Sequence, residues 1–487
     1  MFATTKETHA AVVFLLGEHA YKLKKPVNLG FLDFSTLRAR QAACRQEVEL
    51  NRRLAPDVYE GVADVTGPDG EVCEHLVVMR RMPDERRLAT MVREGRPVDE
   101  HVRAIARQLA GLHAKAPHGP QIGQEGGSQA LRTRWTAGFE QVRSLPDATI
   151  EPRTLDEIEH LTLRFLAGRE SLFEARIAER RIVDGHGDLL AEDIFCLDNG
   201  PRILDCLEFD ERLRFLDGLD DAAFLAMDLE RLGAPRLAEL FLRRYVEFSG
   251  DPAPTALWHH YVAYRAFVRV KVACLRHWQG DVDAGWEARP LAELALHHLR
   301  AGAVTLVLVG GPPGGGKSTL GGALADRLGY TLLRYDRIRA ELAGLDRNAH
   351  AQSGTSSSED IARAYVELLS RAERLLGQGE SVVLDASWGN ARYRAMAADV
   401  ADQTLSNLVA LRCAVMPQIA AARLTARERT LSDADETVDD ATALWAGALE
   451  IDTGTLPEQA LARALAAVHP PELDVSWHFQ RPRMEPD

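Results

Sequence analysis

The sequence predicts a two-domain protein in which an α+β unit precedes an α/β unit. Near the start of the chain, short β-type runs surround a helical stretch, and a mainly helical pattern follows from about residue 86. From about residue 300, strand-length apolar runs alternate with helical segments, which favours a parallel sheet covered by helices. A glycine-rich loop lies between the first of these apolar runs and the next helical segment.

Local patterns place the individual elements. The expected strands lie at Val12–Leu16, Tyr21–Lys25, His75–Arg80, Val304–Val309, Ser381–Asp385 and Leu408–Val415, and the first helix lies at Leu37–Leu54. The stretch Pro117–Ser128 is rich in glycine and proline and therefore predicts a loop within the helical part.

Composition narrows the class of protein. The 487 residues include 58 basic and 72 acidic side chains, and the resulting net charge of −14 argues against coating of nucleic acid. Hydrophobic residues make up 46% of the chain, enough for a core and too many for a disordered protein. The six cysteines form no CxxC pair, so we expect reduced thiols in a cytoplasmic protein. The apolar runs are too short to cross a membrane, and we expect neither a membrane anchor nor an obligate protein partner.

The strongest motif is GPPGGGKST, which follows the apolar run at 304–309 and precedes an amphipathic helical segment. It fits the phosphate-loop pattern GxxxxGK[ST], in which backbone N–H groups approach phosphate oxygens where glycines leave room. The side chain of Lys317 would neutralise phosphate charge, and the hydroxyl of Ser318 would bind Mg²⁺. The loop residues expected to bind ATP are Gly311, Gly314, Gly315, Gly316, Lys317, Ser318 and Thr319.

Charged residues downstream of this loop suit phosphoryl transfer. Asp336 is expected at the end of the next strand, and a base there would accept a hydroxyl proton while Arg339, three residues on, holds an anionic group. Asp385 ends the strand SVVLDAS and would contribute to the Mg²⁺ shell or contact the substrate. Arg423 and Arg427 share a helical face that suits a lid over the phosphates. A solvated helix face explains each arginine equally well, and a helix N-cap is the alternative for Asp336.

These motifs resemble the small P-loop kinases of the gluconate kinase, zeta toxin and polynucleotide kinase type. The phosphate loop, DRIR and VVLDAS carry the resemblance in that order, over about residues 303–465. The resemblance implies an ATP-dependent kinase that phosphorylates a hydroxyl group, and it leaves the acceptor open.

A second motif, DGHGDLLAEDIFCLDNGPRILDCLEFD, lies in the first half of the chain. Asp188 follows His186 and Gly187, Asp193 comes five residues later, and Asp205 ends an apolar run. This spacing is typical of a kinase catalytic loop followed by a metal-binding aspartate. In that chemistry Asp188 would be the base, and Asp193 and Asp205 would bind Mg²⁺.

The surrounding sequence resembles the aminoglycoside phosphotransferase and choline kinase family over about residues 8–290. The resemblance implies a bilobal kinase fold in which Lys24, from AYKLKKPV, contacts ATP and Glu47 pairs with it, with Glu49 as the competitor. Asp221 matches the family's structural aspartate, and His113 is expected to pack in the core. We expect a small lobe at 1–85, a large lobe at 86–298, a P-loop kinase domain at 299–469 and a poorly ordered tail at 470–487.

The first domain departs from its family at two places. Asp193 stands where the family has asparagine, and no glycine-rich loop is found near the N-terminus; only Gly17–Ala20 offers a turn there. Two readings therefore stay open: an active phosphotransferase, or a degenerate, regulatory domain beside a P-loop domain that binds or hydrolyses ATP. Arg265, Arg269 and Arg276 share a helical region and form either an acceptor site for an acidic substrate or a solvated basic face.

The order of the two domains resembles bacterial fusions described as bifunctional aminoglycoside phosphotransferase/ATP-binding proteins. It implies two ATP- and Mg²⁺-dependent sites in one chain, each with a small-molecule phosphate acceptor. A 5′-hydroxyl of nucleic acid is a further candidate acceptor, and the net charge of −14 disfavours it.

Overall fold

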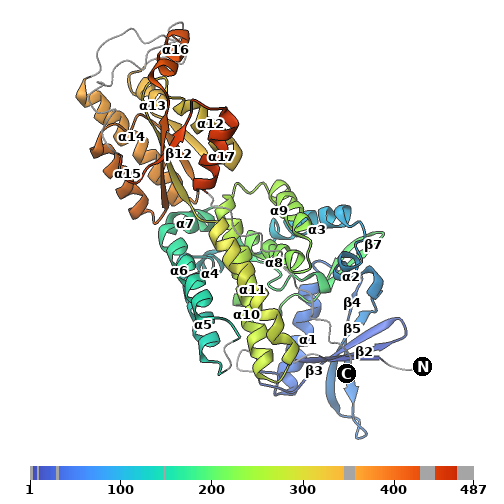
Figure 1. The fold of residues 1–487 in the computed structure, drawn as a ribbon. Coiled ribbons are helices and arrows are strands. Elements are labelled where there is room, and N and C mark those ends of the chain that lie inside the picture. The colour runs from blue at the N-terminus through green and yellow to red at the C-terminus, as the bar shows by residue number, and fades with distance from the viewer. Residues whose placement is uncertain are drawn as a thin grey trace, which may run out of the picture.

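The computed structural model describes residues 4–7, 10–28, 32–146, 149–344, 357–427 and 445–468. Figure 1 shows a small strand-rich lobe, a helical lobe and an α/β domain in succession along the chain. Both predicted fold classes are confirmed. The tail at 470–487 lies outside the described residues.

The small lobe is a five-stranded antiparallel sheet with one helix packed against it, in the strand order β1-β2-β3-β5-β4. Its elements are β1 Thr4–Glu7, β2 Ala11–Leu16, β3 His19–Lys24, α1 Leu37–Asn51, β4 Tyr59–Thr66 and β5 Val72–Arg80. The side chain of Thr36 caps α1 by accepting the N–H of Ala39. Cys44, Val48 and Val77 form part of the core between α1 and the sheet.

The large lobe is a bundle of helices around α8, whose residues from Gly218 to Leu229 are all buried. The helices are α2 Leu88–Arg93, α3 Asp99–His113, α4 Pro120–Glu125, α5 Ser128–Ser144, α6 Pro152–Gly168, α7 Glu170–Ala178, α8 Gly218–Arg231, α9 Pro235–Ser249, α10 Thr255–Trp278 and α11 Val282–Ala301. The predicted loop at 117–128 is wrong in part, because Pro120 begins α4. A proline at the first helical position costs no hydrogen bond.

Two short antiparallel sheets of two strands each lie on this bundle and carry the second motif. β6 (Ile182–Asp184) pairs with β9 (Phe215–Asp217), and β7 (Ile194–Leu197) pairs with β8 (Gly200–Ile203). The segment between β6 and β7 holds the HGD sequence, and the segment after β8 holds Asp205. The two parts of the motif are therefore brought to the same end of the bundle.

The C-terminal domain is a five-stranded parallel sheet with the strand order β11-β12-β10-β13-β14. Its elements are β10 Thr305–Gly310, α12 Lys317–Leu328, β11 Thr331–Arg334, α13 Tyr335–Leu342, α14 Ser358–Gly377, β12 Val382–Asp385, α15 Ala391–Gln403, β13 Asn407–Ala414, α16 Pro417–Arg427, β14 Leu449–Asp452 and α17 Pro457–Val468. The chain leaves the central strand β10 first toward one side and later toward the other. Such a switch point places a ligand crevice at the carboxyl ends of the strands.

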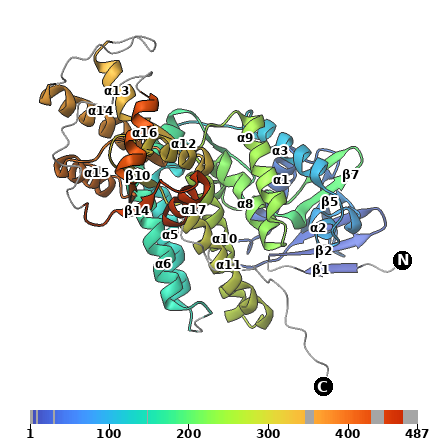
Figure 2. The same cartoon turned by 45° about the horizontal axis from the view of Figure 1, so that its top comes forward.

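The α/β domain lies next to α6 of the helical lobe (Figures 1 and 2), and the turn at 404–406, just before β13, contacts that lobe. Arg169, 1% exposed, donates to the carbonyl of Thr404 and, over 3.0 Å, to the hydroxyl of Ser406. Arg164 donates to the carbonyls of Leu405 and Ser406, both over 3.1 Å. Burial lowers the pKa of Arg169 to about 10. The junction thus holds the amino ends of the strands, opposite the end where a ligand crevice forms.

The predicted domain boundary at 298/299 falls in the last turn of α11, and β10 begins four residues after that helix ends. Within the described ranges, no helix combines the length and the apolar character needed to cross a bilayer.

Two candidate nucleotide sites

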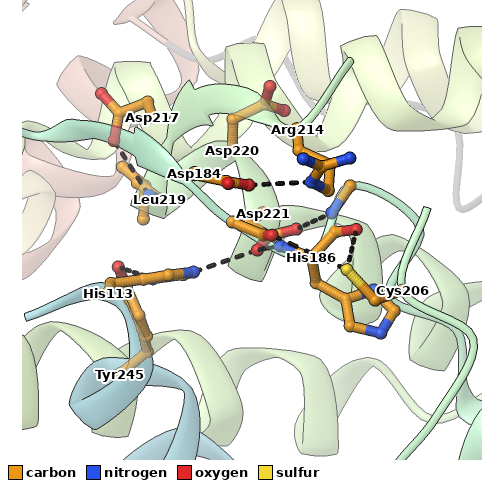
Figure 3. Close-up of polar contacts among 12 residues, drawn as sticks. His113, Asp184, His186, Cys206, Arg214, Asp217, Leu219, Asp220, Asp221 and Tyr245 are labelled. Atoms are coloured by element: carbon orange, nitrogen blue, oxygen red, sulfur yellow. Dashed lines mark hydrogen bonds and ion pairs between the residues drawn. The ribbon is translucent and has the colours of Figure 1, made fainter. Parts of the chain in front are cut away.

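The HGD segment of the large lobe is fixed by one buried carboxylate, that of Asp221 in α8 (Figure 3). Its oxygens accept the backbone N–H groups of His186 at 2.6 Å and Gly187 at 2.9 Å. They also contact Nε2 of His113 at 3.0 Å, while Nδ1 of that ring lies 2.8 Å from the hydroxyl of Tyr245. Burial raises the pKa of Asp221, but these partners outweigh it and hold the pKa well below its usual range. His113 is a packed core residue, as predicted.

Asp188 follows directly on this anchored segment. Gly187 adopts a left-handed φ of +86°, and a Cβ there would lie 3.3 Å from the Leu213 carbonyl oxygen. That turn directs Asp188 out of the buried segment, and its side chain is half-buried. Burial raises the pKa of Asp188 to about 6, against the opposing charge of Arg269. A carboxylate with a pKa near neutrality suits a general base.

Asp205 has a left-handed φ of +63°, a conformation costing about 1–3 kcal/mol outside glycine. The small lobe holds it there: the N–H of Asp205 donates to the Tyr59 hydroxyl over 3.2 Å, and the N–H of Cys206 donates to Oδ1 of Asn51 over 2.9 Å. Backbone strain of this kind, held in place by contacts from the other lobe, is typical of a functional residue.

Asp193 and Asp205 form a pair of like charges. Burial and the Asp205 charge raise the pKa of Asp193 well above its usual range. Burial acts in the same direction on Asp205, but the ammonium of Lys22 outweighs it and lowers the pKa. Asp193 and Asp205 are thus neighbouring carboxylates, and Asp193 resists ionisation. A divalent cation bound between them would stabilise the charged form of both.

The two strand lysines share the carboxylate of Glu47, which is fully buried. Lys22 lies 2.9 Å from Oε1 of Glu47 and 2.5 Å from Oδ1 of Asp205. Lys24 lies 2.5 Å from Oε2 of Glu47 and also contacts Glu208. Glu47 is thus the helix partner, whereas its competitor Glu49 is exposed. Lys24 was the expected ATP lysine, yet Lys22 is the one that reaches Asp205, and Lys24 lies deeper against Glu208.

The three arginines of α10 have different surroundings, so neither prediction for them holds as a group. Arg265 is buried and forms two hydrogen bonds, 2.7 and 2.8 Å, with the carboxylate of Asp220. Arg276 pairs with Asp281 at 2.5 Å. Arg269 lies between them, half-buried, and its charge acts on Asp188.

The phosphate loop of the C-terminal domain is packed too tightly for side chains. A Cβ on Gly311, at φ +135°, would lie 2.6 Å from the carbonyl oxygen of Cys413. A Cβ on Gly314, at φ +73°, would lie 2.6 Å from that of Ala420. Gly316 is the left-handed N-cap of α12. The loop is therefore a backbone cradle at a helix N-terminus, which fits phosphate groups.

The expected functional side chains of this loop lie at the start of α12. Lys317 donates to the carbonyl of Pro312 over 3.3 Å, bending back over the loop. A Cβ on Gly315 would lie 2.7 Å from the same carbonyl oxygen. Ser318 and Thr319 follow in the first helical turn, half-buried and exposed respectively.

A cavity of about 320 Å³ opens beside the loop between α12, α16 and α17. Thr453, after β14, lines it and donates its hydroxyl to the carbonyl of Gly315 over 2.6 Å. Arg423 also lines it and donates to the carbonyl of Thr453 over 2.8 Å. Thr453 lies in no sequence motif and was therefore not predicted. Arg427 ends α16, and its side chain lies outside the described residues.

The predicted acidic residues lie at the carboxyl ends of neighbouring strands. Asp385 ends β12, and Oδ2 of this residue lies 3.9 Å from Nε of Arg334, which ends β11. Gly321 of α12 faces it: a Cβ there would lie 3.8 Å from that of Asp385. Asp336 is exposed in the first turn of α13, and Arg339 lies one turn later, half-buried. The sheet therefore gathers them on the edge where the phosphate loop lies.

Among the described residues, no group of three or more His, Cys, Asp or Glu side chains forms a metal centre by itself. Mg²⁺ in nucleotide sites characteristically takes one or two carboxylates and completes its shell with phosphates and water. Both sites fit that pattern: Asp193 with Asp205 in the first, and Asp385 with the Ser318 hydroxyl in the second.

Comparison with known proteins finds similarity along most of the chain. A family model described as an AAA domain matches residues 306–447. The chain is 44% identical over 457 residues to Uncharacterized protein Rv2004c of Mycobacterium tuberculosis (strain ATCC 25618 / H37Rv), covering 93% of this chain and 91% of that protein. Uncharacterized protein Mb2027c of Mycobacterium bovis matches equally well. The chain belongs to the family of these mycobacterial proteins. The relatives span both domains, so the two-domain order is a property of the family.

Solved structures resemble each half. The GDP complex of aminoglycoside 2′-phosphotransferase-IIIa is 17% identical and covers 61% of this chain and 93% of its own, with a TM-score of 0.39. Choline kinase from Cryptosporidium parvum Iowa II is 11% identical, with coverages of 61% and 88% and a TM-score of 0.37. For the C-terminal part, the APS kinase CysC of Mycobacterium tuberculosis is 19% identical, with coverages of 34% and 98% and a TM-score of 0.28.

Proposed function

We propose that this chain is an ATP- and Mg²⁺-dependent phosphotransferase with two nucleotide sites, each acting on a hydroxyl group of a small molecule. The carrying observation is the arrangement around Asp188. The buried carboxylate of Asp221 in α8 anchors the loop that carries Asp188. Burial raises the pKa of Asp188 to about 6. The residues after β8 bring Asp205 to the same end of the bundle.

In the first site, each residue has a role that its contacts support. Asp188 accepts the proton of the acceptor hydroxyl, and its raised pKa lets it do so near neutral pH. Lys22, held by Glu47 and Asp205, is placed to contact nucleotide phosphates, with Lys24 beneath it. Asp193 and Asp205 hold Mg²⁺, which neutralises charge on the transferring phosphoryl group.

In the second site, the Gly311–Thr319 loop binds phosphates through its backbone and Lys317. Ser318 and Asp385 hold Mg²⁺, and Asp336 is the proposed base, with Arg339 and Arg427 contacting phosphate groups. The cavity lined by Arg423 and Thr453 has room for the remainder of the nucleotide. The net charge of −14 favours small acceptors over nucleic acid, and the six free cysteines favour the cytoplasm.

One feature of the first domain favours a second candidate, a nucleotide-binding regulatory role. β1 and β2 are joined by Thr8, His9 and Ala10, which include no glycine to cover the phosphates. Under this candidate, the domain binds nucleotide without transferring phosphate.

The test uses the full chain carrying Lys317→Ala, so that the first site is the remaining source of turnover. Release of ADP from MgATP is measured for this protein and for the double variant with Asp188→Asn. The proposal expects a fall of about 10²- to 10⁴-fold with nearly unchanged nucleotide binding, because a general base is lost. Equal turnover in both proteins would contradict the assignment of Asp188. Nucleotide binding without turnover in either protein would favour the regulatory role.

A further inference from the structure

Helix α10 packs beside α8, and its polar face is fixed relative to the catalytic loop. Arg265 is bound to Asp220 of α8, and its guanidinium also lies 4.9 Å from the centre of the Phe224 ring. Asp220 directly precedes Asp221, which holds the backbone on which Asp188 stands. Two neighbouring residues of α8 therefore set the position of both α10 and the proposed base.

Arg269 lies one turn after Arg265 and on the same face of α10. Unlike Arg265 and Arg276, it has no hydrogen bond or ion pair to any residue of the described ranges. Its side chain is nevertheless half-buried. Withdrawing a guanidinium from water without a hydrogen-bonded partner is unfavourable, and binding an anion would remove that cost.

Arg269 lies one turn along α10 from Arg265, and its charge acts on the proposed base Asp188. The cations that act on the two aspartates proposed to bind Mg²⁺ include Lys22, Lys24 and Arg87. Arg269 instead acts on Asp188, where its charge opposes the effect of burial. The nucleotide and metal side of the site thus has its own cations, and the Arg269 charge acts on the residue that meets the acceptor hydroxyl.

We propose that Arg269 forms an anion subsite for the phosphate acceptor, so that the first site selects hydroxyl compounds bearing an oxyanion, either a carboxylate or a phosphate group. This inference rests on the proposed function of the first site. An arginine binds two oxygens of such a group at once and fixes its orientation. The acceptor hydroxyl is thereby held at Asp188, which removes its proton as the new oxygen–phosphorus bond forms, the bond to the β-phosphate oxygen breaks and ADP leaves.

The test measures anion binding, which needs no turnover. The full chain is saturated with Mg²⁺ and the non-hydrolysable analogue AMPPNP, so that both phosphate sites are filled, and sulfate or acetate is titrated calorimetrically. Arg269→Gln is expected to weaken binding of the preferred anion at least about tenfold, since a charged hydrogen-bond donor is lost. Arg276→Gln, the matched control on the same helix, is expected to bind like the parent. Preference for sulfate indicates a phosphate-bearing acceptor, and preference for acetate indicates a carboxylate.

One further variant keeps the outcomes distinct. Arg269→Lys retains the charge without the fork and is expected to show an intermediate affinity, provided that circular dichroism shows the same thermal midpoint for all variants. The subsite is overturned if neither anion binds the parent, or if Arg269→Gln binds both like Arg276→Gln. Arg269-dependent anion binding in a protein without ATP turnover would instead contradict the proposed function and leave the subsite standing.

A second readout follows the base itself in the Lys317→Ala background. Besides Arg269, Asp188 faces Arg265 of α10, Asp205 after β8 and Asp228 of α8. Without the Arg269 charge, burial should raise the pKa of Asp188 further. The pH midpoint of ATP turnover is therefore expected to rise in Arg269→Gln and to stay unchanged in Arg276→Gln. An unchanged midpoint in Arg269→Gln would place the guanidinium too far from Asp188 for the proposed role.

Discussion

The two candidate sites differ in what holds them in shape. The C-terminal loop is a run of nine residues whose backbone fits between Cys413 and Ala420, and its glycines leave no space for side chains. The first site is assembled from β3, α1, α8 and the segments around β7 and β8, and ionised side chains hold it together. A backbone cradle depends on local sequence, whereas a charge network depends on the whole domain. Substitutions should therefore affect the two sites in different ways.

The largest difference is expected for Lys317→Ala, which removes a charge and leaves the backbone cradle intact. Nucleotide affinity at the second site should fall about 10- to 100-fold, as for loss of a charged hydrogen bond. Titration of the full chain should then show one bound nucleotide where the parent shows two. Arg327→Ala, at the exposed far end of α12, is the control and should show two. Two tight sites in Lys317→Ala would mean that the loop does not bind phosphate through this residue.

Comparing Lys22→Met with Lys24→Met tests the charge network of the first site. Lys22 reaches Asp205, so its loss should lower ATP turnover at the first site by about tenfold or more. Lys24 separates Glu47 from Glu208 in the interior, so its loss should instead lower stability by about 3–5 kcal/mol. Turnover in the Lys317→Ala background and urea unfolding measure the two effects. The reverse pattern would restore Lys24 as the nucleotide lysine.

The sequence predicted the features that lie in one continuous segment. It did not predict the contacts between residues that are far apart in the chain. The phosphate loop, the HGD segment and the parallel sheet follow from short motifs and periodicity. Lys22 and Lys24 stand on the same face of β3, and only the fold shows which of them meets Asp205. Glu208 and Thr453 lie in no motif, because their roles come from partners far away in the chain.

A third prediction concerns pH and applies to the first site. Asp188 acts as a base in its deprotonated form, which predominates above its pKa of about 6. Turnover in the Lys317→Ala background should therefore rise with pH through that value and be about tenfold lower at pH 5 than on the plateau. Asp188→Asn should show a flat, low profile over the same range. A midpoint near 4 in the parent would mean that burial does not govern the base.

The smallest effect is expected at Asp193, where the carboxylate replaces the asparagine of the resembling family. Burial and the Asp205 charge raise its pKa well above the usual range, which favours the neutral form without Mg²⁺, and Asp193→Asn keeps the shape of that form. Stability without the metal should thus stay within about 0.5 kcal/mol of the parent.

With Mg²⁺ bound, the same substitution removes an anionic ligand. The Mg²⁺ concentration for half-maximal turnover should then rise a few-fold, roughly three to ten times, while the maximal rate holds or increases because less charge retains the metal and ADP. The control is Asp198→Asn on the β7–β8 turn, a 94% exposed carboxylate that pairs with Arg86 and should leave the Mg²⁺ dependence unaltered. An Asp193→Asn protein with the parental Mg²⁺ dependence would show that Asp205 holds the metal without its neighbour.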